Sequence, residues 1–158
     1  MIISIYSDGG TVGANPSLIG GTWAWCAVDE NDNRVLEASG FVEANSHPIS
    51  NNYTEFLALL NALEAMQPNW SGLVYCDSQL TLGRFFHGWR NRNIPDEFVF
   101  RAQKAVNRLG KVTPVLLSGH PSKGELKGGL SKSGRPVSHH NVYVDKLCSE
   151  AASTRGLV

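Results

Sequence analysis

The chain has 158 residues, of which 42% are hydrophobic, and its formal net charge at pH 7 is zero. This length fits one domain that buries a core without disulfides or structural zinc. The neutral balance argues against a general polyanion binder, whose affinity needs a large positive field.

Five stretches have the β-branched and aromatic composition that is typical of strands. The first should end at Asp8-Gly9, which would leave Asp8 in the loop that follows. Turn residues separate it from the next two, so the first three strands are predicted to form an antiparallel meander. The predicted strands are residues 2–7, 20–28, 34–42, 71–76 and 111–117.

Apolar residues at helical spacing predict four helices between and after these strands. Glu55 falls in the first turn of the first helix and Asp145 near the start of the last, whose helix dipole would help to hold its carboxylate ionised. The order of elements predicts an α/β fold, a five-stranded mixed sheet flanked by helices, in a single domain over residues 1–158. The predicted helices are residues 52–66, 78–89, 95–109 and 141–153.

Residues 121–139 have no periodicity and combine glycines with basic side chains. Four lysines or arginines stand there against a single acid, Glu125. We therefore expect a flexible basic loop between the last strand and the last helix.

Four acids, Asp8, Glu55, Asp77 and Asp145, stand where apolar runs meet breaks, at the element ends where active sites assemble. Taken singly, each is typical of a turn or a helix terminus. Carboxylates gathered in one place repel one another unless a cation neutralises them, and hard oxygen ligands suit Mg²⁺ or Mn²⁺. Together the four indicate a divalent-metal site.

The local contexts of these acids, in their order along the chain, resemble the ribonuclease H type 1 family of the retroviral-integrase-like superfamily. The resemblance covers nearly the whole chain. It rests on Asp8-Gly9-Gly10, Asn15-Pro16, Gly20-Gly21, Asn51-Asn52 ahead of Glu55, Asp77-Ser78-Gln79, Gly119-His120, and Asn141 four residues ahead of Asp145.

This resemblance implies a ribonuclease H-like fold and endonucleolytic hydrolysis of the RNA strand of RNA/DNA hybrids by a monomer. It implies two Mg²⁺ or Mn²⁺ ions about 4 Å apart, with Asp8 as the bridging ligand. The metal-binding and catalytic acids would be Asp8, Glu55, Asp77 and Asp145, and the mobile catalytic histidine would be His120. The hybrid-contacting residues would be Asn15, Asn51 and Gln79, whose amides suit a 2′-hydroxyl or a minor-groove base edge.

The chain departs from the family pattern in two places. The usual basic helix and loop after the Asp77 helix is reduced to residues 90–93, and the loop between His120 and Asp145 is longer. We infer that basic residues of this longer loop supply phosphate contacts instead, although a merely solvated linker remains an equal alternative. The longer loop also leaves His139 and His140 as alternatives to His120.

Two other functions remain open. A nuclease of the same superfamily could act on DNA or structured RNA, and a catalytically silent module could bind hybrids without cleaving them. A nucleotide-binding doubly wound domain is excluded because no GxGxxG or P-loop sequence follows a strand. Three cysteines without CxxC spacing indicate reduced core residues. The apolar start lacks a basic flank and is too short for a signal peptide or a membrane span, so we expect a cytoplasmic protein.

Overall fold

A five-stranded mixed sheet organises the molecule, in a computed structural model that describes residues 1–119, 122–132 and 134–154. The sheet order is β3-β2-β1-β4-β5. The first three strands pair antiparallel, as the sequence predicted, while β4 runs parallel to β1 and β5 runs parallel to β4. The strands are β1 (Ile2–Thr11), β2 (Gly20–Asp29), β3 (Arg34–Glu43), β4 (Gly72–Cys76) and β5 (Val112–Leu116).

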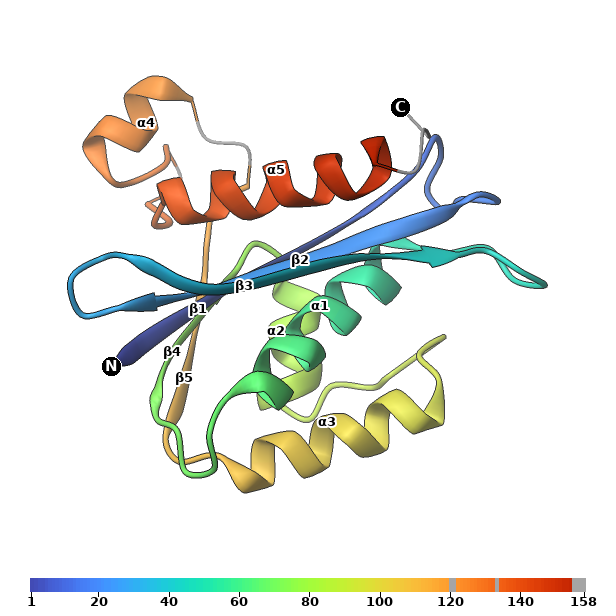
Figure 1. The fold of residues 1–158 in the computed structure, drawn as a ribbon, viewed down its shortest axis with the longest axis horizontal. Coiled ribbons are helices and arrows are strands. Elements are labelled where there is room, and N and C mark those ends of the chain that lie inside the picture. Colours follow the sequence, from blue (N-terminus) through green and yellow to red (C-terminus); the bar gives the residue numbers. More distant parts are fainter. Residues whose placement is uncertain (120–121, 133, 155–158) are drawn as a thin grey trace.

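Helices cover both faces of this sheet (Figure 1). On one face lie α1, α2 and α3, and on the other lies α5, with the short α4 close to its N-terminal end. The expected layers and helix order are confirmed. The helices are α1 (Asn51–Ala65), α2 (Gln79–Phe86), α3 (Asp96–Arg108), α4 (Lys123–Gly128) and α5 (His139–Ser153).

Alternate residues of the central strands divide the core between these two faces. Ile5 packs toward α1 in a cluster with Leu59 and Leu63, whereas its neighbour Tyr6 packs in a second cluster with Val144 of α5. Nearly every α1 residue from Thr54 to Leu63 is buried, because this helix is covered by the sheet on one side and by α2 and α3 on the other. Both layers therefore hold the middle of β1 rigidly.

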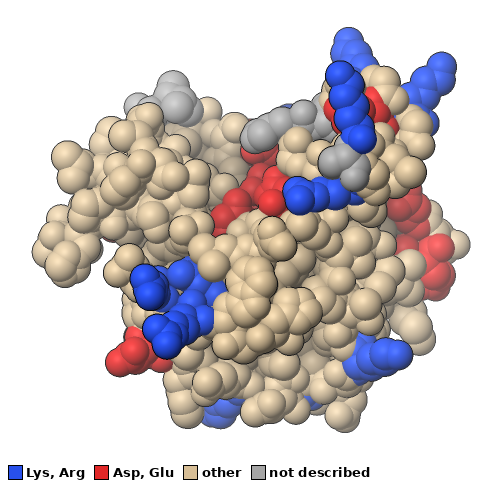
Figure 2. All heavy atoms as spheres, turned by 180° about the vertical axis from the view of Figure 1, so that it is seen from behind, with Lys and Arg blue, Asp and Glu red and all other residues tan. Residues whose placement is uncertain are grey.

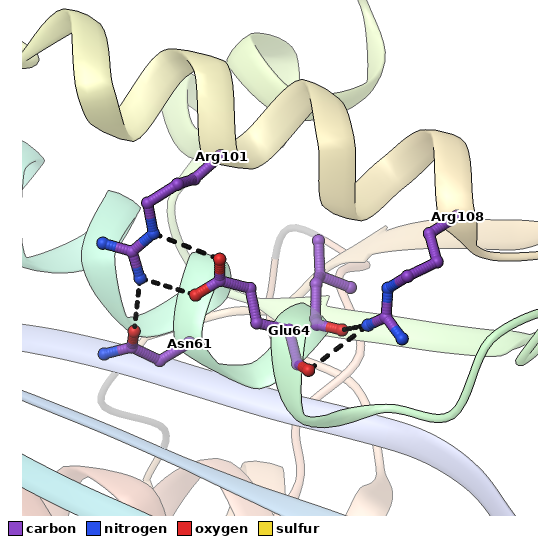
Figure 3. Close-up of polar contacts among 5 residues, drawn as sticks. Asn61, Glu64, Arg101 and Arg108 are labelled. Atoms are coloured by element: carbon purple, nitrogen blue, oxygen red, sulfur yellow. Dashed lines mark hydrogen bonds and ion pairs between the residues drawn. The ribbon is translucent and has the colours of Figure 1, made fainter.

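Polar contacts attach α3 to the exposed side of α1 (Figure 3). The guanidinium of Arg101 donates to both carboxylate oxygens of Glu64 and to Asn61 Oδ1. Arg108 donates to the main-chain carbonyls of Leu63 and Glu64 in the last turn of α1. These contacts fasten α3 to the C-terminal half of α1.

Two expectations about local structure are corrected. The first strand does not end before Asp8 but continues to Thr11, because β2 pairs with it as far as Thr11↔Gly21. The basic stretch contains the helix α4, which begins with a capping box between Ser122 and Glu125 and ends at the left-handed residue Gly129. A helix of six residues is too short to produce a visible apolar period.

All three cysteines are buried and free, as expected. Across the described ranges, no helix combines the length and the apolar character needed to cross a bilayer.

Candidate metal centre

The strand β1 continues beyond the end of its pairing with β4, so Asp8 has no β4 residue beside it. Parallel pairing between the two strands stops at Tyr6↔Tyr75, while β1 continues along β2. Asp8 and Asp77 each lie two residues beyond this last pair, so both carboxylates stand at the same level of the open sheet edge. The position of Asp8 inside a strand holds its backbone more firmly than a loop would.

Gly9 allows α1 to approach β1 at this edge. A Cβ atom at position 9 would lie 2.5 Å from the main-chain nitrogen of Glu55 and 2.5 Å from the carbonyl carbon of Thr54. The first turn of α1 therefore packs directly against the β1 backbone. This close contact brings the side chain of Glu55 to that of Asp8.

Asp8, Glu55 and Asp77 form a compact carboxylate cluster. One oxygen from each lies within 4.8 Å of the others, which is a spacing that could hold a metal ion. The Gly9 N–H donates to Asp8 Oδ1 at 2.9 Å and orients that side chain. Glu55 Oε2 is buried and has no hydrogen-bond partner, so it is available as a ligand.

Burial and mutual repulsion perturb the acids of this cluster. Burial, reinforced by the negative charge of Asp77, raises the pKa of Asp8 to about 8. Burial and the charges of Asp8 and Asp77 raise the pKa of Glu55 well above its usual value. The donor set, all hard oxygens with excess negative charge, fits a divalent cation.

Asp145 borders this cluster from α5 without being among the three acids whose oxygens meet. Its charge contributes to the raised pKa of Asp8. Three residues further along the helix, the Cys148 thiol contacts the Asp8 carbonyl oxygen at 3.5 Å. The middle of α5 therefore packs on β1 beside the acids, and Asp145 lies at the margin of the site.

Gly119 contacts the carboxylate cluster, and no sequence pattern predicted this contact. A Cβ atom there would lie 3.0 Å from Asp77 Oδ2, so the end of the β5 loop packs on this carboxylate. Its neighbour His120, the predicted catalytic histidine, lies outside the described residues.

The alternative histidines differ in their surroundings. His139 is exposed at the start of α5. His140 is buried, with Nε2 2.6 Å from Asp32 Oδ1 and Nδ1 accepting from Arg34 at 3.0 Å. Its ring also packs against Tyr6. Both ring nitrogens of His140 are thus engaged in holding α5 to the β2–β3 turn.

Two of the three predicted hybrid-contacting residues meet in the structure. Asn15 Oδ1 accepts from the main-chain N–H of Asn51, the first residue of α1, at 3.0 Å. Gln79 is exposed at the start of α2, two residues after Asp77. Asn15 thus follows the strand that carries Asp8, Asn51 lies in the helix that carries Glu55, and Gln79 follows Asp77 by two residues.

Comparisons with known proteins agree on one family. No family model matches the chain. A ribonuclease H from Chlorobium luteolum is 33% identical over 104 residues, an alignment that covers 66% of this chain and 65% of the relative's length. The RNase H1 of Halobacterium salinarum superposes with a TM-score of 0.69 at 21% identity, covering 96% of this chain and 98% of the other. LC11-RNase H1, isolated from compost and solved in complex with an RNA/DNA hybrid, superposes with a TM-score of 0.70 at 20% identity, covering 96% and 97%.

These similarities support an assignment of the chain to the ribonuclease H family. Its fold is the ribonuclease H fold over nearly its whole length, and its carboxylate cluster lies where the pairing between β1 and β4 ends.

The short basic segment after α2 has a defined shape. Arg84 of α2 donates to the carbonyls of Arg90 and Arg92, which folds the segment back onto its helix. Arg90 and Arg92 are exposed. The segment thus presents a small basic surface rather than an extended one.

Proposed function

We propose that this chain is an endonuclease that hydrolyses the RNA strand of RNA/DNA hybrids with the help of bound divalent cations. The observation that carries the proposal is the meeting of Asp8, Glu55 and Asp77 oxygens within 4.8 Å, with one buried carboxylate oxygen unpartnered. The named relative and the hybrid complex of a structural neighbour support the choice of substrate.

The residues that would hold the cations are Asp8, Glu55, Asp77 and Asp145. We expect two Mg²⁺ or Mn²⁺ ions with Asp8 between them, because Asp8 is the acid whose charge interacts with all three others. Such ions supply Lewis acidity and a water of lowered pKa for phosphodiester hydrolysis. Asp8 is suited to bridging because its backbone lies within a strand and its Oδ1 is oriented by the Gly9 N–H.

The neighbouring polar residues would position the hybrid. The Asn15–Asn51 hydrogen bond ties the loop after β1 to the first turn of α1, so both amides would approach the substrate as one unit. Because Asn15 Oδ1 is engaged, its amide nitrogen would donate to a 2′-hydroxyl or a base edge. Gln79 would do the same from the start of α2.

The remaining proton transfer is assigned to His120. The family resemblance gives this role to His120, whose neighbour Gly119 packs on Asp77, and a histidine can shuttle protons near neutral pH. His140 is a weaker candidate since Asp32 and Arg34 already engage its ring.

Cleavage of end-labelled substrates tests the proposal. The protein is incubated with an RNA/DNA hybrid, double-stranded RNA, double-stranded DNA and single strands, in Mg²⁺, Mn²⁺ or EDTA, beside Asp77→Asn. We expect metal-dependent internal cuts in the RNA of the hybrid alone. The rate of cleavage should fall at least about 1000-fold in Asp77→Asn.

The two rival functions predict different products. Metal-dependent cutting of DNA or of structured RNA would assign the chain to another nuclease of the superfamily. Hybrid binding without cleavage in either metal would indicate a silent binding module. In either case the assignment of ribonuclease H activity would be withdrawn.

A further inference from the structure

Residues 122–132 and 134–137, which we call the α4 segment, end beside the carboxylate cluster. At its far end the carbonyl of Pro136 accepts from the N–H of Ser118 at 2.9 Å. Ser118 is followed by Gly119, which packs on the Asp77 carboxylate. After Pro136 the chain enters α5, which carries Asp145. The segment is therefore a projection from the rim of the acid site.

Internal hydrogen bonds give the α4 segment a defined shape and engage both carboxylate oxygens of Glu125, its only acidic residue. Glu125 Oε1 accepts from the Ser122 N–H at 3.1 Å, and Oε2 accepts from the Lys132 N–H at 3.0 Å. These bonds lower the pKa of Glu125, so the carboxylate stays ionised. The main chain closes on itself where Val137 N–H donates to the Gly129 carbonyl at 3.2 Å. Both oxygens of the acid thus serve the fold of the segment.

The basic side chains of the segment are left facing solvent. Lys123, Lys127, Lys132 and Arg135 are all exposed. Within the part of the chain that the structure describes, none of them forms an ion pair. Since the segment holds four cations and one anion, it is net +3, and the rest of this neutral chain is net −3.

Figure 2 shows where this charge lies on the surface. Blue side chains gather over α4 at the upper right, beside a recess in which red carboxylates are visible. A polyanion that approaches the acids therefore passes the basic side chains of α4. Such a polyanion needs cationic contacts here, because the acid cluster itself repels phosphates.

We propose that the α4 segment binds the phosphate backbone of the nucleic-acid duplex whose strand occupies the carboxylate site. This inference rests on the proposed function, since it assumes that the acids act on a phosphodiester. The contacts are electrostatic and independent of base sequence. They would take over part of the binding that the short segment after α2 cannot supply.

The test compares two double variants that remove equal charge. Lys123→Ala/Lys127→Ala changes the α4 segment, and Lys104→Ala/Lys111→Ala changes exposed lysines of α3 and the turn before β5, on the other side of the sheet. Binding of a hybrid is measured by fluorescence anisotropy in Ca²⁺ across a range of salt, and cleavage is measured in Mg²⁺.

The α4 variant should lower the slope of log Kobs against log salt by about 1.8, because each lost phosphate contact removes about 0.9. Its KM should rise about tenfold at physiological salt with kcat unchanged, while the control variant matches the native chain. Far-ultraviolet circular dichroism of both variants should match the native spectrum, since the four lysines are exposed.

Equal slopes and KM values in the two variants would overturn the proposal, even if the native chain cleaves hybrids normally. A native chain that neither binds nor cleaves hybrids would instead refute the proposed function.

Discussion

Asp8→Asn should make the metal-free protein more stable while abolishing its activity. An acid whose pKa is raised on folding weakens the folded state as pH rises from the unfolded pKa toward the folded one. For Asp8 this window runs from its ordinary value of 3.8 to about 8. Asparagine has no charge to place there, and it keeps the Oδ1 that accepts from the Gly9 N–H. Its amide can also donate to Glu55.

The size of the effect follows from the spacing of the carboxylates. Two unit charges at the 4.8 Å limit of the cluster repel by about 3.5 kcal/mol at an effective dielectric constant of about 20. Partial protonation of Glu55 reduces this repulsion, so we expect a gain of about 2 kcal/mol at about pH 8.5. For a chain of this length that gain corresponds to a rise in Tm of about 4–8 °C.

Thermal unfolding in EDTA and in Mg²⁺ measures the prediction. In EDTA the Tm advantage of Asp8→Asn should be near zero at about pH 4 and largest at about pH 8.5. Saturating Mg²⁺ should stabilise the native chain by about 2–3 kcal/mol and the variant by much less. Glu97→Gln, which removes an exposed acid of α3, serves as the control. A variant that is less stable than the native chain in EDTA at high pH would refute the repulsion argument.

Two further predictions concern the core around the site. Gly9→Ala should lower the free energy of unfolding by about 3 kcal/mol and weaken metal binding, because its Cβ would overlap the α1 backbone. The control Gly10→Ala, whose Cβ meets only a hydroxyl at 3.4 Å, should lower it by less than about 1 kcal/mol. Chemical denaturation and Mn²⁺ titration of both variants check this, and equal losses of stability in the two variants would contradict it. The cysteine thiols, whose pKa values burial raises to about 12 or beyond, should resist alkylation in the native state and react fully after denaturation, as mass spectrometry would show. Rapid native labelling of any of the three would contradict their buried placement.

Local sequence patterns predicted the fold and the acids for different reasons. Strand alternation and the apolar stripe of α1 are local signals, so the order of elements followed from them directly. The convergence of Asp8, Glu55 and Asp77 followed from family resemblance and from their positions at element ends. The local sequence did not predict that β1 continues past Asp8, because Gly9 and Gly10 are typical of a turn. Pairing with β2 keeps them extended.

Other features depend on contacts between distant residues. Nothing near His140 in the sequence points to Asp32 or Arg34, which lie more than 100 residues earlier. The helix α4 had a signal, the Ser122–Glu125 capping box, but it is hidden among glycines. Asp145 was expected with the other acids, and the structure puts it beside the three whose oxygens meet.

The uneven distribution of charge also affects how this chain meets other molecules in solution. A net +3 projection on a net −3 body makes the neutral molecule a strong electric dipole. A dipole has little long-range attraction for a polyanion, but within a Debye length of about 8 Å it turns the molecule so that its positive end leads. A molecule that approaches the duplex in a random orientation would thus rotate until its acid site faces the duplex. Neutral overall charge would limit non-specific retention on nucleic acid, while the dipole preserves a fast, correctly oriented approach.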